Sequence, residues 1–152
     1  MGITFKGVAH PPPRADGKRN HAADLSRAEI SSCKMGRNGG TDLLVEHEPG
    51  SQVGKVLASW EGPGGELRVQ GVVRDESAVA SVMSGNMRGL SLGTGVTYGA
   101  QGNVRLRNQD ELSLCAEPRR GGCYIEEIDG KRVRTSHNFS NPGGCQRLEP
   151  CR

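Results

Sequence analysis

The sequence has few aromatic side chains and no long apolar run. Phe, Trp and Tyr make up 3% of its 152 residues, and all hydrophobic residues together reach 34%. A core built from such a chain must be packed mainly by Val, Leu and Ala. No run approaches the roughly 18 apolar residues of a membrane span, and no signal peptide precedes the body of the chain. We therefore expect a protein that acts inside a cell, not a secreted one.

An excess of one charge is also missing. The chain has 20 basic and 17 acidic residues, and its net charge of +3 is spread along its length. A nucleic-acid-binding domain usually carries a basic block interleaved with aromatic residues, and none occurs here. The sequence therefore predicts neither a nucleic-acid nor a membrane partner.

Cysteines are few and irregularly spaced. Their number is five, and no CxxC pair occurs. The four histidines do not lie at zinc-finger spacing from them, so we expect no metal and no cofactor. Free thiols are favoured, with one disulfide as the alternative, and no cysteine has the context of a nucleophile. The cysteines are Cys33, Cys115, Cys123, Cys145 and Cys151.

Glycine and proline, in contrast, are plentiful. Twenty-three glycines and eight prolines indicate many turns and short strands. Apolar patterns between the turns predict the strands, and two segments predict helices, one from Asp24 to Met35 and one over 75–86. The expected strands cover residues 2–10, 41–47, 53–61, 66–75, 86–96, 103–108, 111–118 and 122–130.

These elements predict a mainly β (α+β) fold. A chain of this length forms one domain. Seven or eight short strands with two helices favour a single closed or curved β-barrel of about seven strands, with the helices packed outside. The periodicity is lost after Gly130, so we expect a domain over 1–130 and a C-terminal tail or arm over 131–152.

The stretch "NMRGLSLGTGV" holds a single serine, Ser91, in a predicted strand that follows a predicted helix. Such a serine is most often structural. Gly89 and Gly93 give it the spacing G-x-S-x-G, but a nucleophile elbow lies on a strand-to-helix turn. Here the helix precedes the strand, which excludes the elbow type of hydrolase.

A serine nucleophile needs a base within hydrogen-bond reach, and His47 is the best candidate. It ends the apolar strand "LLVEH" and precedes a turn. A histidine in this position is more often an ordinary surface residue. The other histidines are less suitable. His10 lies just before three prolines, and His21 and His137 lie in polar segments.

The base in turn needs an orienting partner, and Glu111 is the best carboxylate for it. Glu46 and Glu48 flank His47, but neighbouring side chains of a strand point to opposite faces. Both are therefore poorly placed to orient the His47 ring. Glu111 opens the buried-looking strand "ELSLC". A glutamate at a strand end is also often an ordinary solvent-exposed residue. His137 in the tail is the competing candidate for this third position.

Taken together, these motifs resemble those of the capsid maturation proteases of herpesviruses (assemblins) and the prohead proteases of tailed phages. His47 precedes a "VGKV" strand, and Ser91 lies in "GLSLG" after a helix. Glu111 opens "ELSLCAEPRRGG", where herpesvirus enzymes have a histidine and phage enzymes an acidic residue. Arg119 and Arg120 match the arginine pair of the family. The resemblance covers roughly residues 42–128.

The resemblance implies a serine endopeptidase that cleaves scaffold and capsid proteins during virus capsid (prohead) maturation, inside the assembling capsid of an infected cell. Its triad would be Ser91, His47 and Glu111. The backbone N–H of Arg119 and the side chain of Arg120 would stabilise the oxyanion. The herpesvirus relatives imply a homodimer.

Two other functions stay open from the sequence. The chain could be a catalytically inactive structural or scaffold-binding capsid-assembly domain of the same fold. It could also be a small β-barrel binding module whose "PRRGG" loop contacts an acidic partner. A complete Ser-His-carboxylate set argues against both, because binding alone does not require it.

Overall fold

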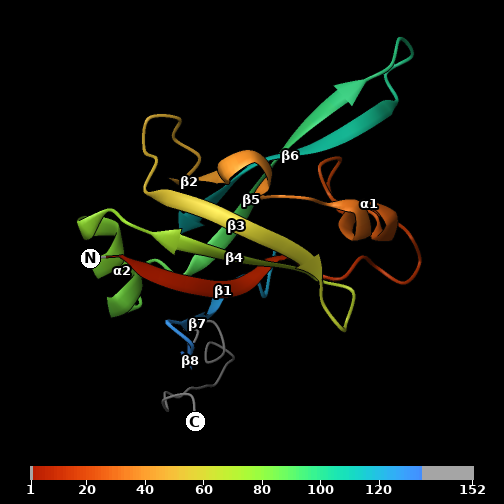
Figure 1. The fold of residues 1–152 in the computed structure, drawn as a ribbon. Coiled ribbons are helices and arrows are strands. Elements are labelled where there is room, and N and C mark those ends of the chain that lie inside the picture. Colours follow the sequence, from red (N-terminus) through yellow and green to blue (C-terminus); the bar gives the residue numbers. More distant parts are fainter. Residues whose placement is uncertain (1, 135–152) are drawn as a thin grey trace.

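The structure, a computed structural model, describes residues 2–134, and β-strands make up most of it (Figure 1). The cysteines 145 and 151 and the tail candidate His137 lie outside the described residues. The strands are β1 (Ile3–His10), β2 (Thr41–Val45), β3 (Gly54–Glu61), β4 (Leu67–Val73), β5 (Gly89–Tyr98), β6 (Val104–Cys115), β7 (Ile125–Ile128) and β8 (Lys131–Arg132). The helices are α1 (Arg27–Ser32), α2 (Glu76–Ser84) and a 3₁₀ turn, η1 (Arg37–Gly39).

The eight strands form one mixed sheet in the order β5-β6-β2-β3-β4-β1-β7-β8. The pairing of β2 with β6 is parallel, and the other ladders are antiparallel. The hairpin expected between residues 53–61 and 66–75 is present as β3 and β4. This topology places β2, β6 and β5 side by side, and these strands carry the predicted site.

The predicted closed barrel of about seven strands is not confirmed. The sheet has eight strands and two ends, β5 and β8. It folds back on itself so that Gly89 forms an isolated bridge with Tyr124, and Leu90 donates a backbone hydrogen bond to the Cys123 carbonyl. These contacts do not extend into a continuous ladder between β5 and β7, because β7 pairs with β1 and β8 instead.

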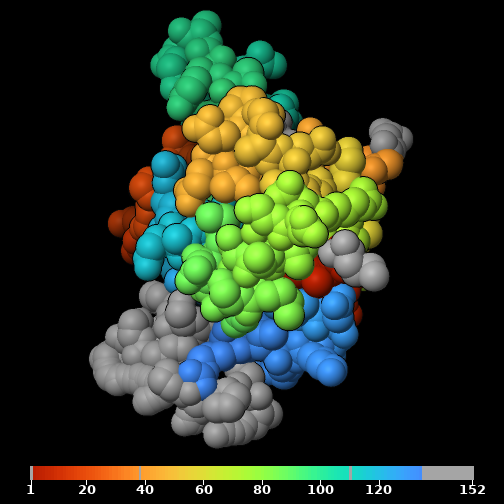
Figure 2. Space-filling view, turned by 90° about the vertical axis from the view of Figure 1, so that its left-hand side faces the viewer, coloured from red at the N-terminus to blue at the C-terminus, as the bar shows by residue number. Residues whose placement is uncertain are grey.

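Residues 109 and 110, which separate the two strands predicted over 103–108 and 111–118, do not interrupt the sheet. Two strands were expected there, and the structure has the single strand β6. The register shifts between Gly93 and Thr94, which pair with Glu111 and Gln109. Such a bulge accommodates one extra residue while pairing continues on both sides. Beyond it, β5 and β6 form a two-stranded ribbon that extends past the rest of the sheet (Figures 1 and 2).

Helix α1 begins later than the sequence predicted. Its N-cap is Ser26, which forms a capping box with Glu29. Asp24, the expected N-cap, instead accepts hydrogen bonds from the backbone N–H groups of Asn20 and His21 and from Arg120. Its carboxylate is therefore already engaged outside the helix.

Helix α2 lies where the sequence predicted it. Asp75 caps its N-terminus, and Gly85 ends it in the left-handed conformation with φ 92°. Ala78 and Val82 face the core, whereas Met83, expected on the same face, is 52% exposed. Four residues after Gly85 the chain enters β5 at Gly89.

Aliphatic side chains fill the core between the sheet and the two helices. Phe5 is the largest, and the aliphatic residues around it include Leu43, Leu90, Leu112 and Leu114. Within the described part of the chain, no helix is long and apolar enough to cross a membrane. Lys131 and Arg132, at the start of the predicted tail, pair with β7 as strand β8. The domain boundary at residue 130 stays a prediction.

Candidate active site

Ser91 lies near the start of β5, at the end of the sheet. It is half-buried, between the buried residues Leu90 and Leu92, which point to the opposite face. Its partner across the antiparallel ladder with β6 is Ser113. Directly opposed residues share a face of the sheet, so the two hydroxyls lie on the same side.

His47 follows β2, which is separated from β5 by the whole width of β6. The strand ends at Val45, two residues earlier than predicted. Glu46 and His47 then adopt left-handed backbone conformations, with φ of 50° and 60°. These values are uncommon for residues other than glycine and turn the chain sharply over the sheet. The imidazole can therefore reach across β6 toward β5.

Hydrogen bonds from several elements hold this turn in place. The N–H of Glu46 donates to the Leu114 carbonyl, and the N–H of His47 donates to the Ser113 hydroxyl. Ser51 accepts from the Val45 N–H and approaches the carbonyls of Val45 and Glu48. The left-handed pair is thus fixed by its surroundings.

The side chains of the three predicted residues form a continuous chain of contacts, with His47 between Ser91 and Glu111. Nε2 of His47 lies 2.9 Å from Ser91 Oγ, and its Nδ1 lies 2.6 Å from Glu111 Oε2. The carboxylate fixes the ring so that Nδ1 carries a proton and Nε2 faces the serine. The His47 side chain is 42% exposed and that of Glu111 is 19% exposed. A substrate can therefore approach the serine, while the carboxylate is partly shielded. Such a set can deprotonate a hydroxyl for nucleophilic attack.

Glu111 has room to reach His47 because its cross-strand partner is Gly93. A Cβ placed on Gly93 would collide with the Glu111 carboxylate. Gly93 matched the G-x-S-x-G spacing in the sequence, but in the structure its role is to leave space for the Glu111 carboxylate. Its position opposite Glu111 depends on the pairing of two strands.

The loop with Arg119 and Arg120 wraps around the beginning of β5. The strand residue Gly89 pairs with Cys115 before the loop and bridges to Tyr124 after it. The backbone of the loop therefore lies beside the strand that carries Ser91, two residues further on.

The two arginines of this loop differ in their surroundings. The Arg119 side chain is exposed. The Nε of Arg120 donates to Asp24 Oδ1 over 2.8 Å, and the two side chains are only 8% and 13% exposed. Burial alone would raise the pKa of Asp24, but the hydrogen bonds from Arg120 and from backbone N–H groups outweigh it and lower that pKa. This buried ion pair anchors the loop to the segment before α1.

Neither Ser113, which contacts His47 and Glu111, nor the pairing of Asp24 with Arg120 was predicted from the sequence. Ser113 is fully buried, and its hydroxyl contacts both His47 and Glu111. The available signal was the single polar residue in the apolar run "LSLC". Asp24 gave no usable signal, because its partner lies 96 residues away.

Among the residues that the structure describes, the three free thiols are buried and are not activated as nucleophiles. Burial raises the pKa of Cys115 to about 11 and that of Cys123 to about 12, so both stay protonated at neutral pH. Cys33, the third free thiol of the described residues, also has a raised pKa through burial. In residues 2–134, no group of three His, Cys, Asp or Glu side chains could hold a metal ion.

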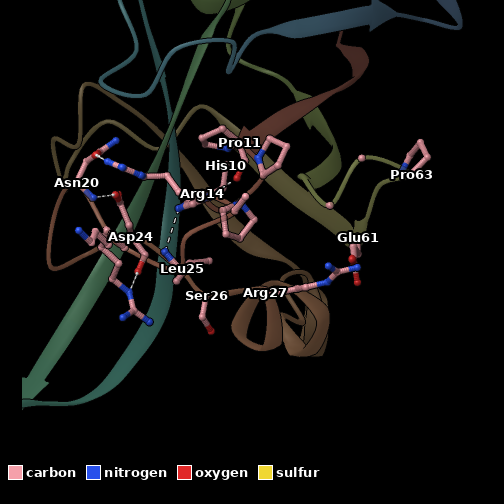
Figure 3. A pocket seen from close by; sticks show the side chains of 18 residues that line it. His10, Pro11, Arg14, Asn20, Asp24, Leu25, Ser26, Arg27, Glu61 and Pro63 are labelled. Carbon is pink, nitrogen blue, oxygen red and sulfur yellow. Dashed lines mark hydrogen bonds between the residues drawn. The ribbon is translucent and has the colours of Figure 1, made fainter.

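A cavity of about 460 Å³ lies beside the prolines that follow β1, and none of the triad residues lines it (Figure 3). His10 is buried at its edge, where Nε2 accepts from the Leu25 N–H and Nδ1 donates to the Pro11 carbonyl. Burial lowers the pKa of His10, although its hydrogen bond to the Pro11 carbonyl acts in the opposite direction. With both nitrogens engaged, His10 is not available as a base for Ser91.

No model of a known protein family matches this chain, and no curated protein is similar to it in sequence. Its fold, however, is similar to that of herpesvirus proteases. Kaposi's sarcoma-associated herpesvirus protease, in complex with a hexapeptide phosphonate inhibitor, aligns with a TM-score of 0.62 at 15% identity, over 84% of this chain and 65% of the viral one. Varicella-zoster virus protease aligns with a TM-score of 0.56 at 13% identity, over 85% of this chain and 64% of the viral one.

The chain thus spans slightly less than two thirds of the length of these two proteases. Identities this low relate the proteins by fold and leave the chemistry to be argued from the site. The expected assemblin-like architecture is confirmed as a fold: the chain has the fold of herpesvirus proteases.

Proposed function

We propose that this protein is a serine endopeptidase that cleaves scaffold and capsid proteins during virus capsid maturation. The observation that carries the proposal is the continuous relay from Ser91 through His47 to Glu111, with contacts of 2.9 Å and 2.6 Å. These groups come from three strands or their ends, so the fold must be complete before they meet. A fold shared with herpesvirus proteases supports the same reading.

In the proposed reaction, Ser91 Oγ attacks the scissile carbonyl carbon while its proton passes to His47 Nε2. The Glu111 carboxylate stabilises the imidazolium that forms. His47 then gives the proton to the leaving amine, the peptide C–N bond breaks, and an acyl-enzyme remains on Ser91. A water molecule, deprotonated by the same imidazole, hydrolyses the ester and restores the serine.

The negative charge on the carbonyl oxygen needs donors that are already in place. We assign the backbone N–H of Arg119 to this role, with the Arg120 side chain assisting directly or through water. The path of their loop around the start of β5 supports this assignment. Loss of one oxyanion donor costs about 3–4 kcal/mol of transition-state stabilisation.

We propose the biological setting by analogy with the herpesvirus proteases of similar fold. Scaffold and capsid proteins are the proposed substrates, and the assembling capsid in an infected cell is the proposed location. One similar structure is a Kaposi's sarcoma-associated herpesvirus protease in complex with a dimer disruptor, with a TM-score of 0.51 at 16% identity. A homodimer is therefore the proposed assembly.

Labelling with a fluorophosphonate tests the enzyme class directly. Attack by Ser91 forms an O–P bond, expels fluoride and transfers the hydroxyl proton to His47. We expect one covalent adduct on Ser91 in the wild-type protein and none in Ser91→Ala or His47→Ala. An unlabelled wild-type protein that still binds scaffold protein would instead support an inactive assembly domain of the same fold.

Substrate identity needs a second measurement. Incubation with purified scaffold protein should yield discrete fragments with the wild-type chain and none with Ser91→Ala. Removing one hydroxyl from a half-buried strand position should leave the unfolding midpoint almost unchanged. Fragments produced equally by the mutant would exclude Ser91 as the nucleophile.

A further inference from the structure

Ser113 lies beneath the relay, on the strand between His47 and Ser91. Its Cα is paired with that of Ser91 in β5 and with that of Leu44 in the parallel strand β2. The side chain is fully buried, between Leu112 and Leu114, which are also fully buried. A polar group at such a position must find hydrogen-bond partners within the protein.

The partners of the Ser113 hydroxyl are the two groups that the relay must keep in position. Its oxygen accepts the backbone N–H of His47 over 2.9 Å. Its one proton goes to Oε1 of Glu111 over 3.1 Å, while Oε2 of the same carboxylate accepts from the His47 ring. Both carboxylate oxygens are thus used, which fixes the orientation of Glu111.

The same hydroxyl lies 3.3 Å from His47 Nδ1. If the serine donated its proton to Nδ1, the ring would carry its proton on Nε2 and could not accept one from Ser91. A carboxylate is the stronger acceptor, because the hydrogen bond to it is charge-assisted. Glu111 therefore draws the serine proton away and leaves Nδ1 as a donor.

The backbone of His47 also needs this support. Its φ of 60° lies in a region that costs free energy for a β-carbon-bearing residue. The hydrogen bond to Ser113 ties this residue to β6, beside the strand of the nucleophile. Without it, the imidazole could shift by a fraction of an ångström, which matters for a proton transfer.

We infer that Ser113 is a positioning residue of the active site, which holds the His47 backbone and the Glu111 carboxylate in register with Ser91. The inference rests on the proposed function for its kinetic consequences and on the structure alone for its hydrogen bonds. The hydrogen bonds of the Ser113 hydroxyl go to His47 and Glu111, so Ser113 acts through these two residues.

The kinetic test compares Ser113→Ala with Ser59→Ala. Ser59 in β3 also accepts a backbone N–H, from Met35 over 3.0 Å, and contacts no triad residue. With a fluorophosphonate as probe, we expect Ser113→Ala to lower the maximal rate of labelling about 10- to 100-fold, with the concentration for half-maximal rate unchanged. Ser59→Ala should label at the wild-type rate.

Combination with Glu111→Gln separates positioning from a general loss of stability. Because Ser113 acts through Glu111 and His47, the double mutant should be hardly slower than Glu111→Gln alone. The inference would be overturned if the rate reduction of the double mutant equalled the product of the two single reductions, or if Ser113→Ala reacted as fast as the wild type. The serine-protease proposal would stay intact in both cases.

An NMR measurement of backbone amide exchange needs no activity. The His47 amide should exchange slowly in the wild-type protein and at least about tenfold faster in Ser113→Ala, with the core amides of β6 unchanged. A His47 amide that exchanges equally fast in both proteins would overturn the inference. If the wild type is not labelled at all, the proposed function fails, and this exchange experiment still decides the role of Ser113.

Discussion

Gly93 shows how one missing side chain serves the site. Its neighbour across the ladder is Glu111, whose carboxylate lies where a Cβ of residue 93 would be. The backbone of Gly93 does not lie in the left-handed region, so an alanine is conformationally allowed. The glycine is therefore required by space alone.

We predict that Gly93→Ala displaces the Glu111 carboxylate from His47 and lowers the labelling rate at least about 100-fold. The matched control is Gly121→Ala, because a Cβ there meets no atom within 4 Å. That variant should fold and label like the wild type. Equal rates in all three proteins would mean that the carboxylate is not needed in its present place.

Glu111→Gln tests the charge of the carboxylate and keeps its shape. The amide cannot stabilise an imidazolium and can present its NH₂ group to His47, which favours the wrong tautomer. We expect the turnover number to fall about 10³- to 10⁴-fold with little change in substrate binding. Deleting residues 135–152 should leave activity in place, and the reverse pattern would favour the tail histidine His137 as the third member.

At the scale of the secondary-structure element, the end of α2 determines where β5 begins. Gly85 has a φ of 92°, and the chain turns there toward Arg88 and the strand of the nucleophile. The Arg88 guanidinium donates to the carbonyls of Val82 and Met83 at this helix end. The turn is therefore specified by both backbone conformation and side-chain capping.

Gly85→Ala should lower the free energy of unfolding by about 1–2 kcal/mol, because a left-handed conformation strains a residue with a Cβ. Gly50→Ala is the control, since that glycine has open space and no left-handed φ. Its stability should stay within about 0.5 kcal/mol of the wild type. Urea unfolding monitored by circular dichroism measures both, and similar losses in the two variants would contradict this account.

At the scale of the whole molecule, the ion pair of Asp24 and Arg120 connects two segments far apart in the sequence. It joins the stretch before α1 to the loop after β6, with a distance of 2.8 Å. The pKa of Asp24 is lowered in the folded protein, despite burial that acts in the opposite direction. Folding is therefore stabilised by this carboxylate above its unfolded pKa of about 3.9, and this stabilisation is lost as the pH falls through the lower folded value.

Asp24→Asn should reduce the free energy of unfolding at pH 7 by about 1.5–3 kcal/mol, the range for hydrogen bonds to charged groups. The difference from the wild type should shrink as the pH falls from about 4 toward the lower folded pKa of Asp24, below which the wild-type carboxylate is also neutral. Asp42→Asn is the control, because its ion pair with Lys55 is exposed and contributes about 0–1 kcal/mol. A difference between Asp24→Asn and wild type that does not change between pH 7 and pH 3 would contradict the role of the charge.

Local patterns alone determined several features of this protein. The hairpin of β3 and β4 follows from alternating apolar residues around a glycine-rich turn, and α2 follows from Asp75, Gly85 and the apolar residues between them. Ser91, His47 and Glu111 could also be selected from the sequence, because a serine, a histidine and a carboxylate each lay at a strand or strand end. These signals all act within about ten residues.

Only the tertiary structure decided how these residues meet. The parallel pairing of β2 with β6 and the register that opposes Gly93 to Glu111 involve contacts between distant segments. The left-handed turn at His47 is hydrogen-bonded to Ser113, which lies 66 residues away. The open sheet, in place of a barrel, results from β7 pairing with β1 instead of continuing along β5. Strand periodicity fixes which face a side chain takes, whereas the choice of neighbouring strand and its register depends on the packing of the complete core.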